Sequence, residues 1–209
     1  MDEKTAFKWH IRHGRMRRGD IMLYCIIGAS GTGKSTLVDK AVERCGMSRV
    51  ITCTTRERRV GEPKSAYHFL SDKEFDQLVK KGELIESDEY HGHQYGTAYF
   101  AVDEALQKGD AFIITTASGY ENLRERYQCR GFVLELDPNI LRARMEKRGD
   151  SKEAIESRLN GLNEELERNA GLDCTHIRLS GDLNRDTAVF LYATVRAQPK
   201  ESIEKEESR

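Results

Sequence analysis

The feature that most constrains this chain is a short glycine-rich segment that follows a run of apolar residues. Residues 21–27 read Ile-Met-Leu-Tyr-Cys-Ile-Ile, and a continuous apolar run that ends at a glycine is typical of a fully buried strand. Directly after it come Gly28, four further residues, and then Gly33, Lys34 and Ser35. Helical periodicity starts at Ser35. A strand, a glycine-rich turn and a helix in this order predict an α/β protein.

This turn has the pattern of a phosphate-binding loop, or P-loop. Its glycines let backbone N–H groups curl round a polyphosphate, and the start of the helix adds partial positive charge. Lys34 is expected to bridge the β- and γ-phosphates of ATP, and Ser35 to offer its hydroxyl to Mg²⁺. A glycine-rich turn without a ligand is the alternative, but the motif and its context favour a nucleotide. The residues expected to bind ATP are Gly28, Ala29, Ser30, Gly31, Thr32, Gly33, Lys34, Ser35 and Thr36.

The loop alone leaves several classes of nucleotide-binding protein open. A GTPase would need a base-reading Asn/Thr-Lys-x-Asp motif, which the sequence lacks. An ATPase motor is usually longer than the 209 residues of this chain. A small ATP-dependent kinase is therefore the interpretation that the sequence favours.

The amino-acid composition limits the kinds of binding partner and the cellular compartment expected for this chain. The formal net charge of −1 argues against a protein that holds nucleic acid by bulk charge. The five scattered cysteines fit a reducing cytosol better than a disulfide framework or a zinc site. The longest apolar run is too short to span a bilayer, and the basic N-terminus lacks the apolar part of a signal peptide. We therefore expect a cytoplasmic protein with small-molecule partners, and its oligomeric state stays open.

The chain divides into a central domain and two polar tails. Residues 1–19 form a basic arm, interpreted as a solvated segment or as a dock for a phosphorylated or acidic partner, and residues 198–209 form a charged tail. Residues 20–197 alternate short apolar runs with amphipathic segments, which predicts a mostly parallel sheet with helices on both faces. Strands are expected over 21–27, 50–54, 111–115, 132–136 and 176–179, and helices over 35–44, 72–81, 102–108, 120–127, 139–147, 152–167 and 184–196.

A second candidate phosphate site follows the strand expected at 50–54. Arg56, Arg58 and Arg59 stand within four residues, and arginine forks bind phosphate oxygens through two parallel hydrogen bonds. A solvated basic turn is the alternative for this segment taken alone. Further along the chain are two tyrosines, a carboxylate and a hydroxyl suited to the phosphate and base of a nucleotide: Tyr67, Glu86, Tyr95 and Thr97.

The order of these motifs resembles that of the guanylate kinase family over about residues 22–195. The motifs are Gly-Lys-Ser at 33–35, Thr-Thr-Arg-x-x-Arg-x-Gly-Glu at 54–62, Tyr-x-Phe-x-Ser at 67–71, Glu-Phe at 74–75 and Gly-x-x-Tyr-Gly-Thr at 92–97. Five motifs in order are much more specific than one loop. The resemblance implies a three-layer P-loop fold whose parallel core spans 20–50, 98–137 and 169–197, with an acceptor-binding region at 51–97 and a helical lid at 138–168.

The resemblance also implies roles for single residues. Those that would hold the GMP phosphate are Arg56, Arg59, Tyr67 and Tyr95, and those that would read the guanine are Thr52, Glu86 and Thr97. A carboxylate opposite guanine is chemically sensible because it accepts from N1–H and the exocyclic amine together, whereas adenine offers no such donor pair. A plain surface position is the alternative for Glu86.

The expected lid carries several arginines. By position Arg148 and Arg158 match the family's residues that close over the transferring phosphoryl group, with Arg144 in support. The expected catalytic set is therefore Lys34, Arg59, Arg144, Arg148 and Arg158. Phosphoryl transfer needs alignment and positive charge on the equatorial oxygens more than covalent chemistry by the protein. Arg142 and Lys147 are interpreted as solvent-facing charges.

The chain also departs from the family pattern. Where the family ends its third core strand with aspartates, residues 113–119 read Ile-Ile-Thr-Thr-Ala-Ser-Gly. Arg58 replaces a proline in the arginine turn, and Ser180-Gly181-Asp182-Leu183 replaces Asn-Asp-Asp-Leu near the expected adenine contact. The favoured hypothesis is transfer of the ATP γ-phosphate to GMP or dGMP. The alternatives are a kinase for ribose 1,5-bisphosphate or another small phosphate acceptor, and a non-catalytic binding module of guanylate-kinase-like fold.

Overall fold

The computed structural model describes residues 21–29, 31–59, 61–90 and 92–196. The side chains of several residues in the last range, Arg148 and Arg158 among them, are not described. The basic arm and the charged tail expected at the two ends lie outside these ranges. Among the described residues, no helix combines the length and apolarity needed to cross a bilayer.

The core is a five-stranded sheet in the order β2-β7-β1-β8-β9, in which every neighbouring pair is parallel. The strands are β1 (Leu23–Ile27), β2 (Ser48–Arg49), β7 (Ala111–Ile114), β8 (Cys129–Leu136) and β9 (Thr175–Leu179). The apolar run before the glycine-rich loop forms the central strand β1, and all five residues of this strand are buried. The expected parallel sheet is thus confirmed.

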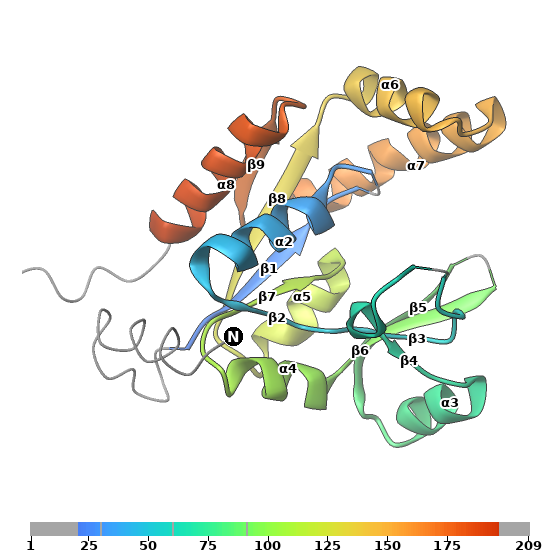
Figure 1. The fold of residues 1–209 in the computed structure, drawn as a ribbon, viewed down its shortest axis with the longest axis vertical. Helices are drawn as coiled ribbons and strands as arrows, with labels where there is room; N and C mark the ends of the chain where they lie inside the picture. The colour runs from blue at the N-terminus through green and yellow to red at the C-terminus, as the bar shows by residue number, and fades with distance from the viewer. Residues whose placement is uncertain (1–20, 30, 60, 91, 197–209) are drawn as a thin grey trace, which may run out of the picture.

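Helices cover both faces of this sheet because alternate residues of β1 point to opposite sides. Tyr24 and Ile26 pack in one apolar cluster with residues of α2 (Lys34–Cys45) and α8 (Leu183–Arg196). Leu23, Cys25 and Ile27 pack in a second cluster with residues of α4 (Tyr99–Leu106) and α5 (Ala117–Arg124). Figure 1 shows the resulting three layers.

Two further parts extend from the same end of the core (Figure 1). One is a helical pair, α6 (Pro138–Arg148) and α7 (Lys152–Ala170), which follows β8. The other is a four-stranded sheet in the order β4-β3-β6-β5, covered by α3 (Asp72–Lys80) through buried Phe75. Its strands are β3 (Cys53–Thr54), β4 (His68–Phe69), β5 (Leu84–Tyr90) and β6 (His93–Ala98), and a short 3₁₀ turn, η1 (Lys64–Ala66), precedes β4.

The expectation of one strand over residues 50–54 is wrong. Ser48 and Arg49 pair with β7 in the core sheet, whereas Cys53 and Thr54 pair with β4 and β6 in the second sheet. The stretch contains the crossover between the two sheets, where Val50 is buried and Ile51 and Thr52 are half-buried, so it forms no continuous ladder. The antiparallel pairing of β6 with β3 and β5 was not expected from the sequence either.

Candidate active site

The glycine-rich loop lies at the carboxyl end of β1, where ligands bind in open α/β sheets. Gly28 has φ 144°, and a Cβ added there would lie 2.5 Å from the carbonyl oxygen of Leu134 on β8. Only glycine fits so close to the neighbouring strand. Helix α2 begins directly after Gly33. The expected loop is therefore present as a strand, a turn and a helix, with Ser30 outside the described residues.

Lys34 folds back over the loop. Its Nζ donates to the carbonyl oxygens of Gly28 at 2.5 Å and Ala29 at 2.8 Å. Burial lowers the pKa of Lys34 to about 8, and the charge of Glu165 opposes that shift. An ammonium group held by backbone carbonyls and partly desolvated is suited to a phosphate, because an anion compensates the buried positive charge.

Ser35 and Thr36 lie exposed in the first turn of α2. Within the described residues, no group of three or more His, Cys, Asp or Glu side chains is placed to hold a metal ion. Mg²⁺ usually retains several waters and binds substrate phosphates rather than all-protein cages. The exposed hydroxyl of Ser35 fits an ion that arrives with a nucleotide.

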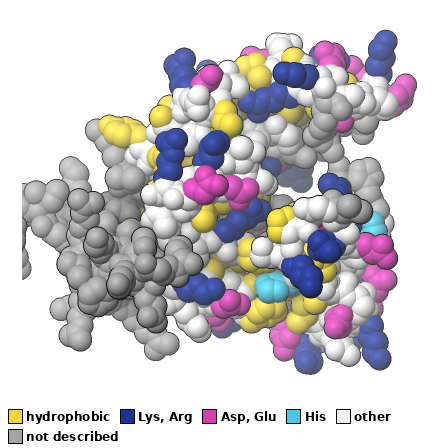
Figure 2. Space-filling model, in the orientation of Figure 1, with side chains coloured by type: hydrophobic (Ala, Val, Ile, Leu, Met, Phe, Trp, Pro, Cys, Tyr) yellow, Lys and Arg dark blue, Asp and Glu magenta, His cyan; other side chains and the backbone are white. Residues whose placement is uncertain are grey.

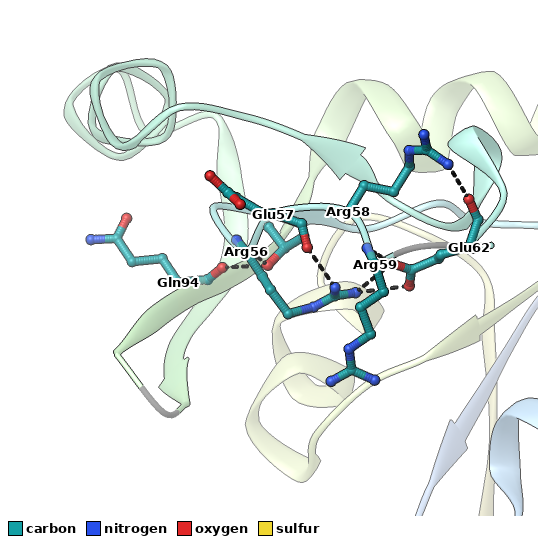
Figure 3. Close-up of polar contacts among 7 residues, drawn as sticks. Arg56, Glu57, Arg58, Arg59, Glu62 and Gln94 are labelled. Atoms are coloured by element: carbon teal, nitrogen blue, oxygen red, sulfur yellow. Dashed lines mark hydrogen bonds and ion pairs between the residues drawn. The ribbon is translucent and has the colours of Figure 1, made fainter.

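The arginine turn at 56–62 is organised by one carboxylate (Figure 3). The Nη2 atom of Arg56 donates to both oxygens of Glu62, at 2.8 and 3.0 Å, and the backbone N–H of Arg59 donates to the same carboxylate at 2.9 Å. These hydrogen bonds hold the pKa of Glu62 below its usual value, and the bond from Arg56 has the largest effect. The hydrogen bond to Glu62 in turn raises the pKa of Arg56. Glu62 thus fixes one guanidinium and the backbone of the next arginine.

The guanidinium of Arg59 points away from Glu62 in Figure 3. It makes no hydrogen bond or ion pair with any residue that the structure describes, so its five donors remain free to meet an anion. Arg58, which replaces the family's proline, turns the other way and donates to the carbonyl oxygen of Glu62 at 2.5 Å. Arg56 and Arg59, the pair expected from the sequence, therefore lie on one turn. Arg58 stabilises that turn through its hydrogen bond to the Glu62 backbone.

Aromatic rings line the same turn. The guanidinium of Arg56 lies 5.6 Å from the ring centre of Tyr67 and 5.8 Å from that of Phe69. Tyr67 and Tyr95 meet edge to face, with ring centres 6.2 Å apart. The structure therefore brings together Arg56, Tyr67 and Tyr95, three residues that the sequence predicts at the acceptor phosphate.

Glu86 is the point where the second sheet meets the core. It stands on β5, and its carboxylate accepts hydrogen bonds from Thr97 on β6 and from Thr115 and Thr116, which follow β7. The expected pair of Glu86 and Thr97 is therefore in contact. The third residue expected at the base, Thr52, lies one position before β3, and its carbonyl oxygen accepts from the N–H of His68 at 2.9 Å.

The helical pair reaches the phosphate loop through Arg144. Its guanidinium donates to the carbonyl oxygen of Thr32 at 3.4 Å and to that of Gly181 at 2.9 Å. Arg148 is the last residue of α6 and Arg158 lies within α7, and the side chains of both fall outside the described part of the chain. The space-filling view shows the molecule hollowed between these helices and the second sheet, with Lys and Arg side chains at the border (Figure 2).

Sequence reasoning missed several residues that support the site. Thr54 and Thr55 pin the arginine turn to β6: the hydroxyl of Thr54 donates to the carbonyl oxygen of Gln94, and the hydroxyl of Thr55 accepts from the Gln94 N–H. Asp186 fixes the loop near Arg144, since it accepts from Ser180 and from the Gly181 N–H.

Comparison with known proteins places these features in context. Residues 21–174 match the family model described as guanylate kinase. The guanylate kinase of Helicobacter pylori (strain ATCC 700392 / 26695) is 34% identical over 178 residues, covering 82% of this chain and 85% of the relative. That of Vibrio parahaemolyticus is 32% identical over 185 residues, covering 84% and 87%.

Two solved structures share the fold. The guanylate kinase from Anaplasma phagocytophilum superposes with a TM-score of 0.66 at 20% identity, covering 87% of this chain and 89% of that one. A gluconokinase from Sinorhizobium meliloti 1021 gives 0.52 at 17% identity, covering 87% and 95%.

A parallel α/β core with a phosphate-binding loop at the end of its central strand defines the class of P-loop kinase folds. Within that class, the chain belongs to the guanylate kinase family.

Proposed function

We propose that this chain transfers the γ-phosphoryl group of ATP to the 5′-phosphate of GMP or dGMP, releasing ADP and GDP or dGDP. The observation that carries the proposal is the placement of Glu86, a carboxylate bonded to Thr97 at the junction of the second sheet and the core. A carboxylate there can accept from guanine N1–H and the exocyclic amine together. Membership of the guanylate kinase family supports the same acceptor.

The donor side of the mechanism rests on the phosphate loop. Backbone N–H groups of the loop would surround the ATP phosphates, and Lys34 would exchange its two carbonyl partners for β- and γ-phosphate oxygens. Mg²⁺ supplies charge neutralisation on the phosphates when bound, and Ser35 would be its protein ligand. Arg144 already contacts the loop backbone at Thr32, so a short movement would bring its guanidinium onto the transferring group.

The acceptor side rests on the arginine turn. Arg56, held by Glu62, and Arg59, whose guanidinium points away from it, would bind the GMP phosphate, with Tyr67 and Tyr95 beside them. No general base is needed, because the attacking phosphate oxygen is ionised at neutral pH. Alignment of the two phosphates and positive charge on the equatorial oxygens then lower the barrier.

Closure completes the site in this proposal. Residues 51–97 would act as the acceptor-binding region and residues 138–168 as a lid that brings Arg148 and Arg158 over the phosphoryl group and excludes water. The remaining parts of the assignment are a cytoplasmic location, Mg²⁺ as cofactor, and small-molecule nucleotides rather than nucleic acid as partners.

An acceptor panel tests the proposal. ADP release in a coupled assay is measured with GMP, dGMP, AMP, UMP and ribose 1,5-bisphosphate under identical ATP and Mg²⁺. Turnover with GMP and dGMP alone is expected. Turnover with the sugar phosphate alone would remove the base-reading role of Glu86, and failure to bind ATP would favour a non-catalytic binding module.

A further inference from the structure

The carboxylate of Glu86 is surrounded by three threonine hydroxyls from separate parts of the fold. Its Oε1 atom accepts from Thr97 Oγ1 at 3.1 Å and from Thr115 Oγ1 at 2.8 Å. Its Oε2 atom accepts from Thr116 Oγ1 at 2.8 Å. Thr97 belongs to the same sheet as Glu86, whereas Thr115 and Thr116 follow core strand β7. Both oxygens of the carboxylate are therefore bonded to the core, and Oε1 is also bonded to its own sheet.

Thr115 is itself rigidly held. It is only 7% exposed, and its backbone N–H donates to the carbonyl oxygen of Ile26 at 3.1 Å. Ile26 lies on β1 two positions before Gly28, where the phosphate loop starts. Thr115 thus connects the carboxylate, through its hydroxyl, to the strand that leads into the phosphate loop, through its backbone N–H.

Thr116 is fixed by helix α5. It is the N-cap residue of that helix, and its hydroxyl accepts from the N–H of Gly119 at 3.1 Å. The amide nitrogen of Asn122 on the same helix donates to the carbonyl oxygen of Ile85 at 2.9 Å, next to Glu86. Helix α5 therefore holds both the hydroxyl and the backbone beside the carboxylate.

Gly119 leaves the space that the carboxylate occupies. A Cβ added there would lie 1.8 Å from Glu86 Oε2 and 2.2 Å from Thr115 Oγ1. Its backbone φ is outside the positive range in which glycine is favoured, so no conformational demand explains the residue. The absence of a side chain at this position serves the fit of Glu86 against α5.

We propose that Thr115 and Thr116 are positioning residues that fix the Glu86 carboxylate for guanine. This inference rests on the proposed role of Glu86 in binding guanine, and it explains which residues orient the Glu86 carboxylate. A carboxylate has about four lone-pair sites, and three are engaged here. A base with two donors therefore displaces one hydroxyl. Thr97 makes the longest of the three bonds and turns its hydroxyl to the base, while Thr115 and Thr116 keep the carboxylate in place.

Equilibrium binding by calorimetry tests this inference. GMP, IMP and a non-hydrolysable ATP analogue are titrated into the wild type and into Thr115→Val, Thr115→Ser and Gly119→Ala. IMP is the informative partner because it keeps N1–H and lacks the exocyclic amine. The matched control is Thr194→Val, since the hydroxyl of Thr194 is also buried and, among the described residues, donates to carbonyl oxygens of its own helix α8. The melting temperature of each variant is measured alongside.

The Thr115→Val protein is expected to bind GMP about tenfold more weakly, as the loss of one hydrogen bond to a charged group predicts. Its preference for GMP over IMP falls several-fold, and binding of the ATP analogue is unchanged. Thr115→Ser restores GMP binding to within about twofold, because it keeps the hydroxyl. Gly119→Ala weakens GMP binding while every hydroxyl remains, and Thr194→Val binds GMP like the wild type.

Three results are distinguishable from one another: the first two contradict the positioning role, and the third contradicts the proposed function. If the wild type binds GMP and Thr115→Val binds GMP and IMP in the same ratio as the wild type, the positioning role is wrong. If weakening extends equally to the ATP analogue, the threonine acts on overall folding and not on the carboxylate, which also overturns the inference. If the wild type does not bind GMP at all, the proposed function fails first.

Discussion

The Nη2 atom of Arg56 lies 2.8 and 3.0 Å from the two carboxylate oxygens of Glu62. The same carboxylate accepts from the backbone N–H of Arg59, so one acidic side chain fixes both arginines expected at the acceptor phosphate. An arginine that already has its guanidinium oriented loses less side-chain entropy when a phosphate binds.

Replacing Glu62 by Gln tests this relationship. The amide keeps the shape but loses the charge and one of the two acceptors, so Arg56 and the turn lose their fixed geometry. We expect the KM for GMP to rise by about tenfold, with the KM for ATP unchanged. The matched control is Glu57→Gln, because Glu57 lies on the same turn with its exposed carboxylate directed away from Arg56. Equal KM values for GMP in the two variants would contradict the role given to Glu62.

Lys34 gives a prediction about pH. Its pKa is lowered from 10.5 to about 8 by burial, and bound phosphates raise the pKa of a nearby ammonium group. ATP binding should therefore take up a proton when the pH lies above about 8 and below the higher pKa of Lys34 in the ATP-bound protein. ATP affinity should weaken as the pH rises above about 8. Calorimetry in two buffers of different ionisation enthalpy, at about one pH unit above that value, measures the uptake.

The variant Lys34→Ala supplies the control for that titration. It should lose the proton uptake and lower kcat at least about a hundredfold, since it removes a charge that acts on the transferring phosphoryl group. Its circular dichroism should match that of the wild type. Lys40→Ala, six positions further along α2, should keep both kcat and the uptake. A normal kcat in Lys34→Ala would remove this lysine from the mechanism.

Glu86→Gln addresses the choice of base. A carboxylate accepts from both guanine donors, whereas an amide offers one acceptor and presents its own N–H₂ to the other donor. We expect kcat/KM for GMP to fall by about a hundredfold. Any residual turnover of AMP should stay the same. Equal loss with all acceptors would show that Glu86 does not read the base.

Asp186 gives a prediction about stability. Its buried carboxylate accepts from the N–H and hydroxyl of Ser180 and from the N–H of Gly181, at 2.7, 2.8 and 3.1 Å. Asp186→Ala should therefore lower the free energy of unfolding by about 2–4 kcal/mol in urea titrations. The exposed Asp182, which caps α8 through the N–H of Arg185, is the comparison, and Asp182→Ala should cost about 1 kcal/mol. Similar losses in the two variants would contradict the special role of Asp186.

The core of the fold could be predicted because its signals are local. The buried strand at 21–27 and the glycine pattern after it are recognised from adjacent residues, although in the fold β1 pairs with the distant strands β7 and β8. The helix starts were less accurate: α5 begins at Ala117, before the expected residue 120, because the hydroxyl of Thr116 caps it.

The second sheet could not be predicted because its strands carry no clear pattern. Strand β5 reads Leu-Ile-Glu-Ser-Asp-Glu-Tyr. Among its described side chains, only that of Ile85 is buried. Charged residues on an open antiparallel sheet hide the alternation that identifies a strand. Residues 50–54 were predicted as one strand for the opposite reason, since their sequence resembles a core strand although the chain crosses there from one sheet to the other.

The residues proposed for the acceptor site were predicted from the family resemblance, whereas the residues that support them were not predicted. Glu86 is 29 residues from Thr115 in the sequence, and the hydroxyl contact between them exists only because two sheets meet. The sequence marks Thr115 and Thr116 only as a departure from the family pattern, whereas the structure gives both of them Glu86 as a partner. No local pattern predicts such a contact.

Transfer of labelled phosphate tests the central claim most directly. ATP labelled at the γ-phosphate is incubated with GMP, Mg²⁺ and the full chain, and the products are separated. The account predicts that the label appears in GDP, at its β-phosphate, with a rate that depends on GMP concentration. Label that appears only as inorganic phosphate, or that stays in ATP while GMP is present, would contradict it.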